Sequence, residues 1–296
     1  MKKVYLFLLI VIAIHGRAQN TSVPTTTPLI KQLNNQKTKS KITKLIKPKD
    51  WNILFPNRYG IKQKDTLNHN PDFYSYQSFI KAASVFPTFL SEGDKSTQKR
   101  ELAAFLANIA QETSGGWDDA PDGYFKYGLY FAEEQTPQGK LDYNDITKIK
   151  YPGVTGKQYY GRGPKQLSWN YNYAQFSEAW YGTKDTLLQH PEYLSRDAVI
   201  SFASAIWFWT TPQFPKPSCH DIMVNKWIPN ENDLLKGRLP GFGATVNVIN
   251  GGVECGTGKD LQKTSYRYQY YLYFCNYFKV TPGDNINCTN QKPFGQ

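Results

Sequence analysis

The sequence QETSGGWDDAPDGYFKYGLYFAEEQ, residues 111–135, places a glutamate near each end of a loop rich in Gly, Asp and aromatic residues. Before this loop, apolar residues recur at the i, i+3, i+4, i+7 spacing of one buried helix face, at Leu102, Phe105, Leu106 and Ile109. The spacing predicts a helix over residues 96–112. Gly115-Gly116 should end it, because glycine readily adopts the positive φ of a helix end.

Glu112 and Glu134 are candidates for a pair of catalytic carboxyls. If the predicted helix continues to Glu112, this side chain lies at the edge of the buried face, where partial loss of water disfavours its charged form. Glu134 lies between Glu133 and Gln135, a polar setting in which a carboxylate stays ionised. Contrasting environments of this kind suit a general acid and a general base. The alternative is that both glutamates lie on solvated surfaces.

The N-terminal sequence predicts an exported protein. Lys2 and Lys3 precede an apolar run over 4–14 that is too short for a membrane span, and small residues at 16 and 18 fit a cleavage site after Ala18. We expect a signal peptide over 1–18, a flexible Lys- and Thr-rich linker over 19–50 and a catalytic domain over 51–296. The mature protein should be extracellular or periplasmic, with no membrane partner.

The net charge of +11 lies mostly outside the predicted domain. Residues 1–18 contribute +3 and residues 19–50 contribute +6, so residues 51–296 carry only +2. A nearly neutral domain gives no reason to expect a nucleic-acid partner.

The four cysteines, Cys219, Cys255, Cys275 and Cys288, allow three full pairings, and their spacing does not choose among them. They lack the paired spacing of a zinc site, so no metal is expected. The sequence also contains no P-loop and no dinucleotide-binding fingerprint, so no cofactor is expected.

The segment YYGRGPKQLSWNYNY, residues 159–173, alternates polar and apolar residues after a Gly- and Pro-rich turn. At a period of two, one face of an extended strand would carry the uncharged polar set Gln166, Ser168, Asn170 and Asn172. Such side chains suit sugar hydroxyls and N-acetyl groups, while neighbouring aromatics cover sugar rings. An ordinary edge strand with a polar outer face explains the pattern equally well.

The remaining elements read mainly as helices. Ser75 is expected to cap one of them, and Asp197 or Ser195 to cap another that ends in the apolar run 205–209. We interpret Trp207 and Trp209 as packing residues. Asn250 would face a cleft at the end of a short apolar element. These elements favour a mainly α domain with a groove between two lobes.

Taken together and in order, these motifs resemble the plant-type chitinases, family 19 of the glycoside hydrolases. The resemblance covers residues 73–294. It rests on AAFLANIAQETSGGW (103–117), APDGYFKYGLYFAEEQ (120–135), the segment 159–173, AIWFWTTPQFPKPSCHD (205–221), PGFGATVNVINGGVECG (240–256) and the closing segment 288–294.

The resemblance implies a mainly α, two-lobed, lysozyme-like fold with a central substrate cleft. It also implies hydrolysis of β-1,4-linked N-acetylglucosamine polymers with inversion. Glu112 would be the general acid and Glu134 the general base, with Ser168 helping to hold the attacking water. Substrate would be bound by Ser114, Gln166, Tyr171, Asn172, Asn250 and Arg267. Arg267 with Glu254 would also tie the C-terminal lobe to the cleft, and Cys255 would pair with Cys288.

Three departures from the family pattern stand out. Gln111 replaces a signature histidine, Ala203 replaces a frequent lysine, and Tyr130 stands where a cysteine is usual. None of them alters either glutamate. The partners of Cys219 and Cys275 stay open.

The favoured function is a secreted, monomeric endochitinase acting on chitin or chitooligosaccharides without a cofactor. A peptidoglycan hydrolase is the first alternative, because bacterial walls also contain β-1,4 bonds to N-acetylhexosamines. A catalytically inert chitin-binding protein is the second. That class would be expected to lose a carboxylate or the serine, whereas Glu112, Glu134 and Ser168 are all present.

Overall fold

The computed structural model describes residues 27–35, 41–58, 72–114, 116–135, 142–258 and 262–295, so the predicted signal peptide lies outside the described residues. The helices are α1 (Leu29–Asn35), the 3-10 helix η1 (Lys41–Lys44), α2 (Pro48–Leu54), α3 (Tyr76–Ala83), α4 (Lys95–Thr113), the 3-10 helix η2 (Tyr124–Lys126), α5 (Asn170–Tyr181), α6 (Asp185–Gln189), α7 (Tyr193–Arg196), α8 (Ala198–Thr210), α9 (Cys219–Met223), α10 (Glu231–Leu235), α11 (Phe242–Glu254) and α12 (Gln262–Phe278). Across these ranges β pairing is limited to isolated bridges, which confirms the mainly α prediction. No helix within them is long and apolar enough to cross a bilayer.

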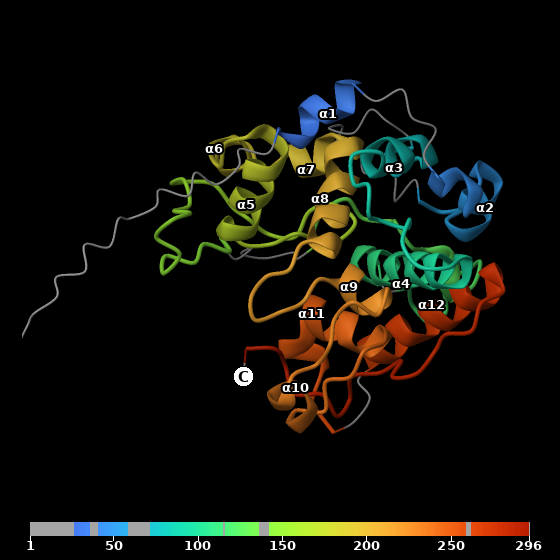
Figure 1. Ribbon diagram of the computed structural model, residues 1–296. Coiled ribbons are helices and arrows are strands. Elements are labelled where there is room, and N and C mark those ends of the chain that lie inside the picture. The colour runs from blue at the N-terminus through green and yellow to red at the C-terminus, as the bar shows by residue number, and fades with distance from the viewer. Residues whose placement is uncertain are drawn as a thin grey trace, which may run out of the picture.

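Helix α4 lies at the centre of the fold, with α12 packed along it (Figure 1). Asp94 caps its N-terminus by accepting a hydrogen bond from the main-chain N–H of Thr97. Every residue from Glu101 to Ala110 is buried, so the predicted helix is confirmed but is covered on all sides rather than on one face. Its alanines let neighbouring helices approach closely. The position of Glu112 in the last turn therefore depends on several packed elements at once.

The other helices form two groups on either side of α4 (Figure 1). Helices α1, α2, α3, α5, α6, α7 and α8 make up one group, in which α8 packs against α3. Helices α9, α10, α11 and α12 make up the other, in which α11 packs against α9. The predicted two-lobed arrangement is therefore confirmed.

Aromatic side chains fill much of the core. Trp51 on α2 is fully buried and stacks on Phe79 of α3, with ring centroids 4.9 Å apart. Trp207 and Trp209 on α8 are 6% and 2% exposed, which confirms their predicted packing role. Burial of such large side chains is the main favourable contribution to folding.

Side-chain caps confirm two predicted helix starts. Ser75 accepts a hydrogen bond from the main-chain N–H of Ser78 at the start of α3. Asp197 accepts from the N–H of Val199 and of Ile200 at the start of α8. Each cap satisfies donors that would otherwise have no partner within the helix.

The segment expected to be a flexible linker differs from that expectation in its described part. Residues 29–35 form α1, which packs against α5, and residues 41–44 form η1. Ile42 and Ile46 are only 3% and 0% exposed. Polar composition suggested a solvated tail, but these isoleucines bury enough apolar surface to hold the chain against the domain.

The predicted strand over 166–173 is wrong. Arg162 and Leu167 form an isolated bridge, and helix α5 begins at Asn170. Asn170 is fully buried, where its side-chain oxygen accepts from the N–H of Asp145 and its nitrogen donates to the main-chain oxygen of Tyr151. The prediction from alternating polarity failed here because polar side chains that were expected to face solvent are buried. They bind the main chain of a neighbouring loop instead.

Candidate active site

The end of α4 carries Glu112 and receives the chain that leads to Glu134. The hydroxyl of Thr113 accepts a 2.7 Å hydrogen bond from the N–H of Leu129, and the carbonyl of Thr113 accepts from the N–H of Phe131. These bonds fold the aromatic loop back onto the helix end. The two glutamates, distant in sequence, are thus attached to one local scaffold.

Arg267 on α12 binds Glu112 directly. Its Nη2 donates to Oε1 of Glu112 at 2.7 Å, and the Glu112 side chain is 15% exposed. The same guanidinium donates to both carboxylate oxygens of Glu254, at 2.6 and 3.1 Å, and to the side-chain oxygen of Asn108 at 3.0 Å. All three nitrogens of Arg267 are therefore occupied, which fixes the guanidinium beneath Glu112.

This buried network shifts the pKa values of Glu254 and Arg267. Burial alone would raise the pKa of Glu254, but the charge and hydrogen bonds of Arg267, with a bond from Asn250, lower it. Burial alone would lower the pKa of Arg267, but the charges of Glu112 and Glu254 raise it. Glu254 therefore stays ionised and keeps Arg267 in place as a cation.

Glu134 is held by a different set of partners. Its main-chain N–H donates to the carbonyl of Gly161 at 2.8 Å, and the N–H of Gly161 donates to Oε2 of the Glu134 side chain at 3.3 Å. The hydroxyl of Tyr143 donates to Oε1 at 3.1 Å. The two donors to this half-buried carboxylate that the structure describes, Tyr143 and Gly161, are neutral, whereas a cation orients Glu112.

Most of the other predicted site residues lie in segments that hold the two glutamates. Ser114 follows Glu112 at the end of α4 and bonds the carbonyl of Tyr127. Asn250 lies at a kink inside α11 and donates to Glu254 at 2.8 Å. Asn172 is nearly buried and donates to the carbonyl of Ser168. Tyr171 stacks on Trp169, with ring centroids 6.3 Å apart.

Three predicted residues have contacts that differ from the expected roles. The hydroxyl of Ser168 donates to the carbonyl of Gln166 at 3.0 Å, so its proton is not directed at Glu134. The amide of Gln166 donates to the carbonyl of Gly163 at 2.9 Å. Arg267 is only 2% exposed, so its observed role is to hold carboxylates rather than to meet solvent.

Sequence reasoning missed several residues of the site. Asn108 precedes Glu112 by one helical turn. Its amide lies within an apolar helix face, and a buried amide requires a hydrogen-bond partner, so the sequence pattern could have indicated it. No local sequence pattern indicated Tyr143, because it lies in a segment that was predicted to be a polar surface loop.

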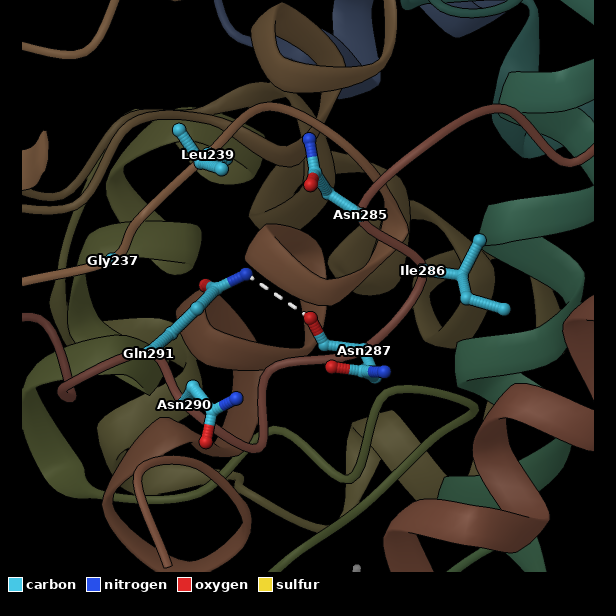
Figure 2. A pocket seen from close by; sticks show the side chains of 7 residues that line it. All are labelled: Gly237, Leu239, Asn285, Ile286, Asn287, Asn290 and Gln291. Carbon is cyan, nitrogen blue, oxygen red and sulfur yellow. Dashed lines mark hydrogen bonds between the residues drawn. The ribbon is translucent and has the colours of Figure 1, made fainter. Parts of the chain in front are cut away.

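A separate hollow of about 400 Å³ lies between residues 237–239 and the C-terminal segment. Figure 2 shows Gly237, Leu239, Asn290 and Gln291 at its left and Asn285, Asn287 and Ile286 further to the right. Its polar lining consists of the amides of Asn285, Asn287, Asn290 and Gln291. No ionisable side chain lines it, so it offers neither an acid nor a base.

Two cysteines near the site form a disulfide. Cys255, directly after Glu254, is bonded to Cys288, with Cα atoms 5.0 Å apart, as the sequence resemblance implied. Cys219 and Cys275 are free and buried. Among the residues that the structure describes, no three His, Cys, Asp or Glu side chains gather as metal ligands.

The two-lobed helical fold is the lysozyme-like one, and its two candidate glutamates match the carboxyl pair that a glycoside hydrolase requires. The family described as chitinase class I matches residues 54–288, so the chain belongs to this family, family 19 of the glycoside hydrolases.

Individual relatives agree with this assignment. Endochitinase A2 from Pisum sativum is 44% identical over 254 residues, which cover 86% of this chain and 74% of the pea protein. Chitinase 1 from Oryza sativa is 47% identical over 223 residues, covering 75% and 68% of the two chains. The "inactive chitinase-like protein 1" from Hevea brasiliensis is 48% identical over 239 residues, covering 78% and 74%.

Solved structures of chitinases share the fold. Chitinase C from Streptomyces griseus superposes with a TM-score of 0.63 at 29% identity, over 82% of this chain and 97% of that one. A class IV chitinase from Zea mays gives 0.60 at 28% identity, over 83% and 98%.

Proposed function

We propose that this protein is a secreted endochitinase that hydrolyses β-1,4 bonds between N-acetylglucosamine units with inversion. The observation that carries the proposal is the contrasting support of the two glutamates. Arg267 holds Glu112 from one side of the fold, while Gly161 and Tyr143 hold Glu134 from the other. Two carboxyls that are fixed separately can perform two different proton transfers.

In the proposed reaction, Glu112 is the general acid. Its Oε1 accepts the hydrogen bond from Arg267, and Oε2 accepts none from the described residues. The proton for the leaving glycosidic oxygen is therefore assigned to Oε2. As the bond breaks, the negative charge that forms on Glu112 is stabilised by the guanidinium already in contact with it.

Glu134 is assigned as the general base. The donors from Tyr143 and Gly161 orient its carboxylate, which removes a proton from the attacking water. Inversion requires space for this water between the two carboxyls, which in inverting enzymes are about 6.5–9.5 Å apart. The hydroxyl of Ser168 would assist once substrate and water are bound, since rotation about its C–O bond can redirect the proton.

The remaining assignments concern substrate and compartment. Ser114, Gln166, Tyr171, Asn172 and Asn250 supply the hydroxyls and amides proposed to bind chitin, and Arg267 acts on substrate through Glu112. The apolar run over 4–14 and the small residues before position 19 support export after removal of residues 1–18. The proposed mature enzyme is a monomer without a cofactor.

A second candidate is a catalytically inert chitin-binding protein. The Hevea brasiliensis relative whose name includes "inactive" is the observation that favours it. The presence of Glu112 and Glu134, together with Arg267 and Tyr143 in contact with them, favours the enzyme.

The deciding experiment is NMR analysis of the products released from chitin hexaose, beside a turbidity assay on bacterial cell walls. Chitooligosaccharides released with the α-anomeric configuration support the inverting chitinase. Products of the β configuration contradict the mechanism. If the protein clears bacterial walls but does not cleave the hexaose, it is a peptidoglycan hydrolase. Chitin binding without turnover supports the inert binder.

A further inference from the structure

Lys165 is a buried cation that the proposed mechanism does not use. It lies in the turn between Gly161 and Ser168 and is only 9% exposed. Its Nζ lies 4.4 Å from the ring centroid of Phe208 on α8. Within the described part of the chain it makes no hydrogen bond or ion pair. The ammonium has three N–H donors, and its Nζ keeps enough contact with solvent to reach a bound acceptor.

The position of Lys165 links it to both glutamates. Its turn is fastened beside Glu134, because Gly161 pairs with Glu134 and the N–H of Gly163 donates to the carbonyl of Ala132 at 2.8 Å. Burial lowers the pKa of Lys165, and the charge of Glu112 is the largest influence opposing that decrease. The ammonium is thus carried by the Glu134 loop and lies within the electrostatic reach of Glu112.

The local backbone leaves the side chain little freedom to turn away. Arg162 and Leu167 close the turn through two main-chain hydrogen bonds of 3.2 and 2.9 Å. A Cβ on Gly163 would lie 2.8 Å from the hydroxyl oxygen of Ser201, so the turn is pressed against α8. The Phe208 ring on the same helix then covers the ammonium. The turn that carries Lys165 is therefore held in place, with the ammonium beside this ring.

A fixed ammonium distinguishes the two forms of the sugar. N-acetylglucosamine is neutral and offers a carbonyl oxygen at C2, which is an acceptor for an N–H donor. Glucosamine has a charged ammonium at C2 instead, which offers no acceptor and is repelled by a like charge. A buried cation near a sugar site would therefore favour acetylated rings and exclude deacetylated ones.

We infer that Lys165 is a specificity-determining residue that donates to the N-acetyl carbonyl of a bound sugar and rejects glucosamine at that position. The inference rests on the proposed chitin-binding function. It assigns to this site a preference for fully acetylated chitin over chitosan.

The test measures binding in the Glu112→Gln background, so that substrate is not consumed. Calorimetry gives Kd for chitin tetraose and for its fully deacetylated counterpart, at a pH where glucosamine amines are charged. Lys165→Met should weaken binding of the acetylated tetramer about tenfold or more, the effect of losing a hydrogen bond to a charged group. Binding of the deacetylated tetramer should stay equal or improve. The preference, defined as the ratio of the Kd of the deacetylated tetramer to that of the acetylated one, should therefore fall at least tenfold.

Two controls separate specificity from structure. Lys165→Arg keeps the charge and should retain most of the preference. Lys99→Met makes the same chemical change at a half-buried lysine on α4 whose Nζ already donates to the carbonyl of Phe278 at 2.8 Å. It should lower the melting temperature without altering the preference. Melting curves of Lys165→Met should show no large loss, because removing an unpaired buried charge is not destabilising.

The inference is overturned if Lys165→Met changes both affinities by the same factor or leaves both unchanged. It is also overturned if Lys99→Met alters the preference as much as Lys165→Met does. Failure of the proposed enzyme function gives a different result. In that case the unsubstituted protein does not cleave chitin hexaose, while the effect of Lys165 on tetramer binding persists.

Discussion

Arg267, on α12, donates a 2.7 Å hydrogen bond from Nη2 to Oε1 of Glu112 in the last turn of α4, across 155 positions of sequence. The same nitrogen also donates to Glu254, so one guanidinium joins a candidate catalytic carboxyl to a buried structural one. Glu112 is therefore oriented by the packing of α12 along α4. Changes far from residues 111–135 should consequently affect catalysis.

Glu112→Gln should reduce kcat on chitin hexaose by about 10²–10⁴-fold, the usual contribution of a general acid. The amide keeps the shape of the side chain and an oxygen for Arg267, but it cannot donate the required proton. Calorimetry should show nearly unchanged binding of chitin tetraose. Substantial residual turnover would remove Glu112 from the role of acid.

Arg267→Met should destabilise the fold by about 3–5 kcal/mol, because it leaves the buried carboxylate of Glu254 without its cation. Urea unfolding measures this loss. The double variant Arg267→Met/Glu254→Met should recover much of the stability, since neither charge then stays buried alone. Activity should not recover with it, because Glu112 has still lost its donor. Recovery of both together would show that Arg267 acts on stability only.

Tyr143→Phe should lower kcat about tenfold or more with little change in KM, because it removes the hydroxyl that donates to Glu134. Tyr151→Phe is the matched control, since its hydroxyl donates at 2.9 Å to Glu178 outside the site. Steady-state kinetics on chitin hexaose compare the two variants. Equal losses in both would indicate a general effect of the loop.

His220 should make stability depend on pH. Burial alone would lower its pKa, but hydrogen bonds and charges from Glu101 and Glu92 raise it above the usual value of about 6.5. Its Nδ1 lies 2.7 Å from Glu101 and its Nε2 lies 3.2 Å from Glu92, which also pairs with Lys226. The charged form of His220 is therefore favoured by folding.

A raised pKa in the folded state gives a stabilisation that is fully present below pH 6.5 and is lost as pH rises through the folded value. Urea unfolding of the native protein should show this contribution decreasing on the alkaline side. His220→Asn should cost about 1–3 kcal/mol at low pH and flatten the dependence. His190→Asn is the control, because the His190 side chain is 44% exposed beside Glu192. An equal flattening in the control would contradict the assignment to His220.

Local sequence patterns predicted individual elements well. The apolar spacing of Leu102, Phe105 and Ile109 predicted α4, and Ser75 and Asp197 cap helices as expected. Predictions from local patterns were wrong where packing between distant segments determines the structure. The polar residues of 166–173 were expected to face outward from a strand, yet Asn170 is buried in α5 and bonds a loop near Asp145. Likewise, Ile42 and Ile46 are buried against the domain, although the composition of their segment predicted a solvated linker.

The sequence by itself determined the family, the helical character and the two candidate glutamates, because periodicity, capping and motif order are encoded within short segments. Only the tertiary structure decided what surrounds those glutamates. Arg267 and Tyr143 reach them from separate parts of the chain, and Lys165 is largely covered only when its turn packs against α8. Hydrogen-bond partners and desolvation depend on which surfaces meet, and that is set by the packing of whole elements.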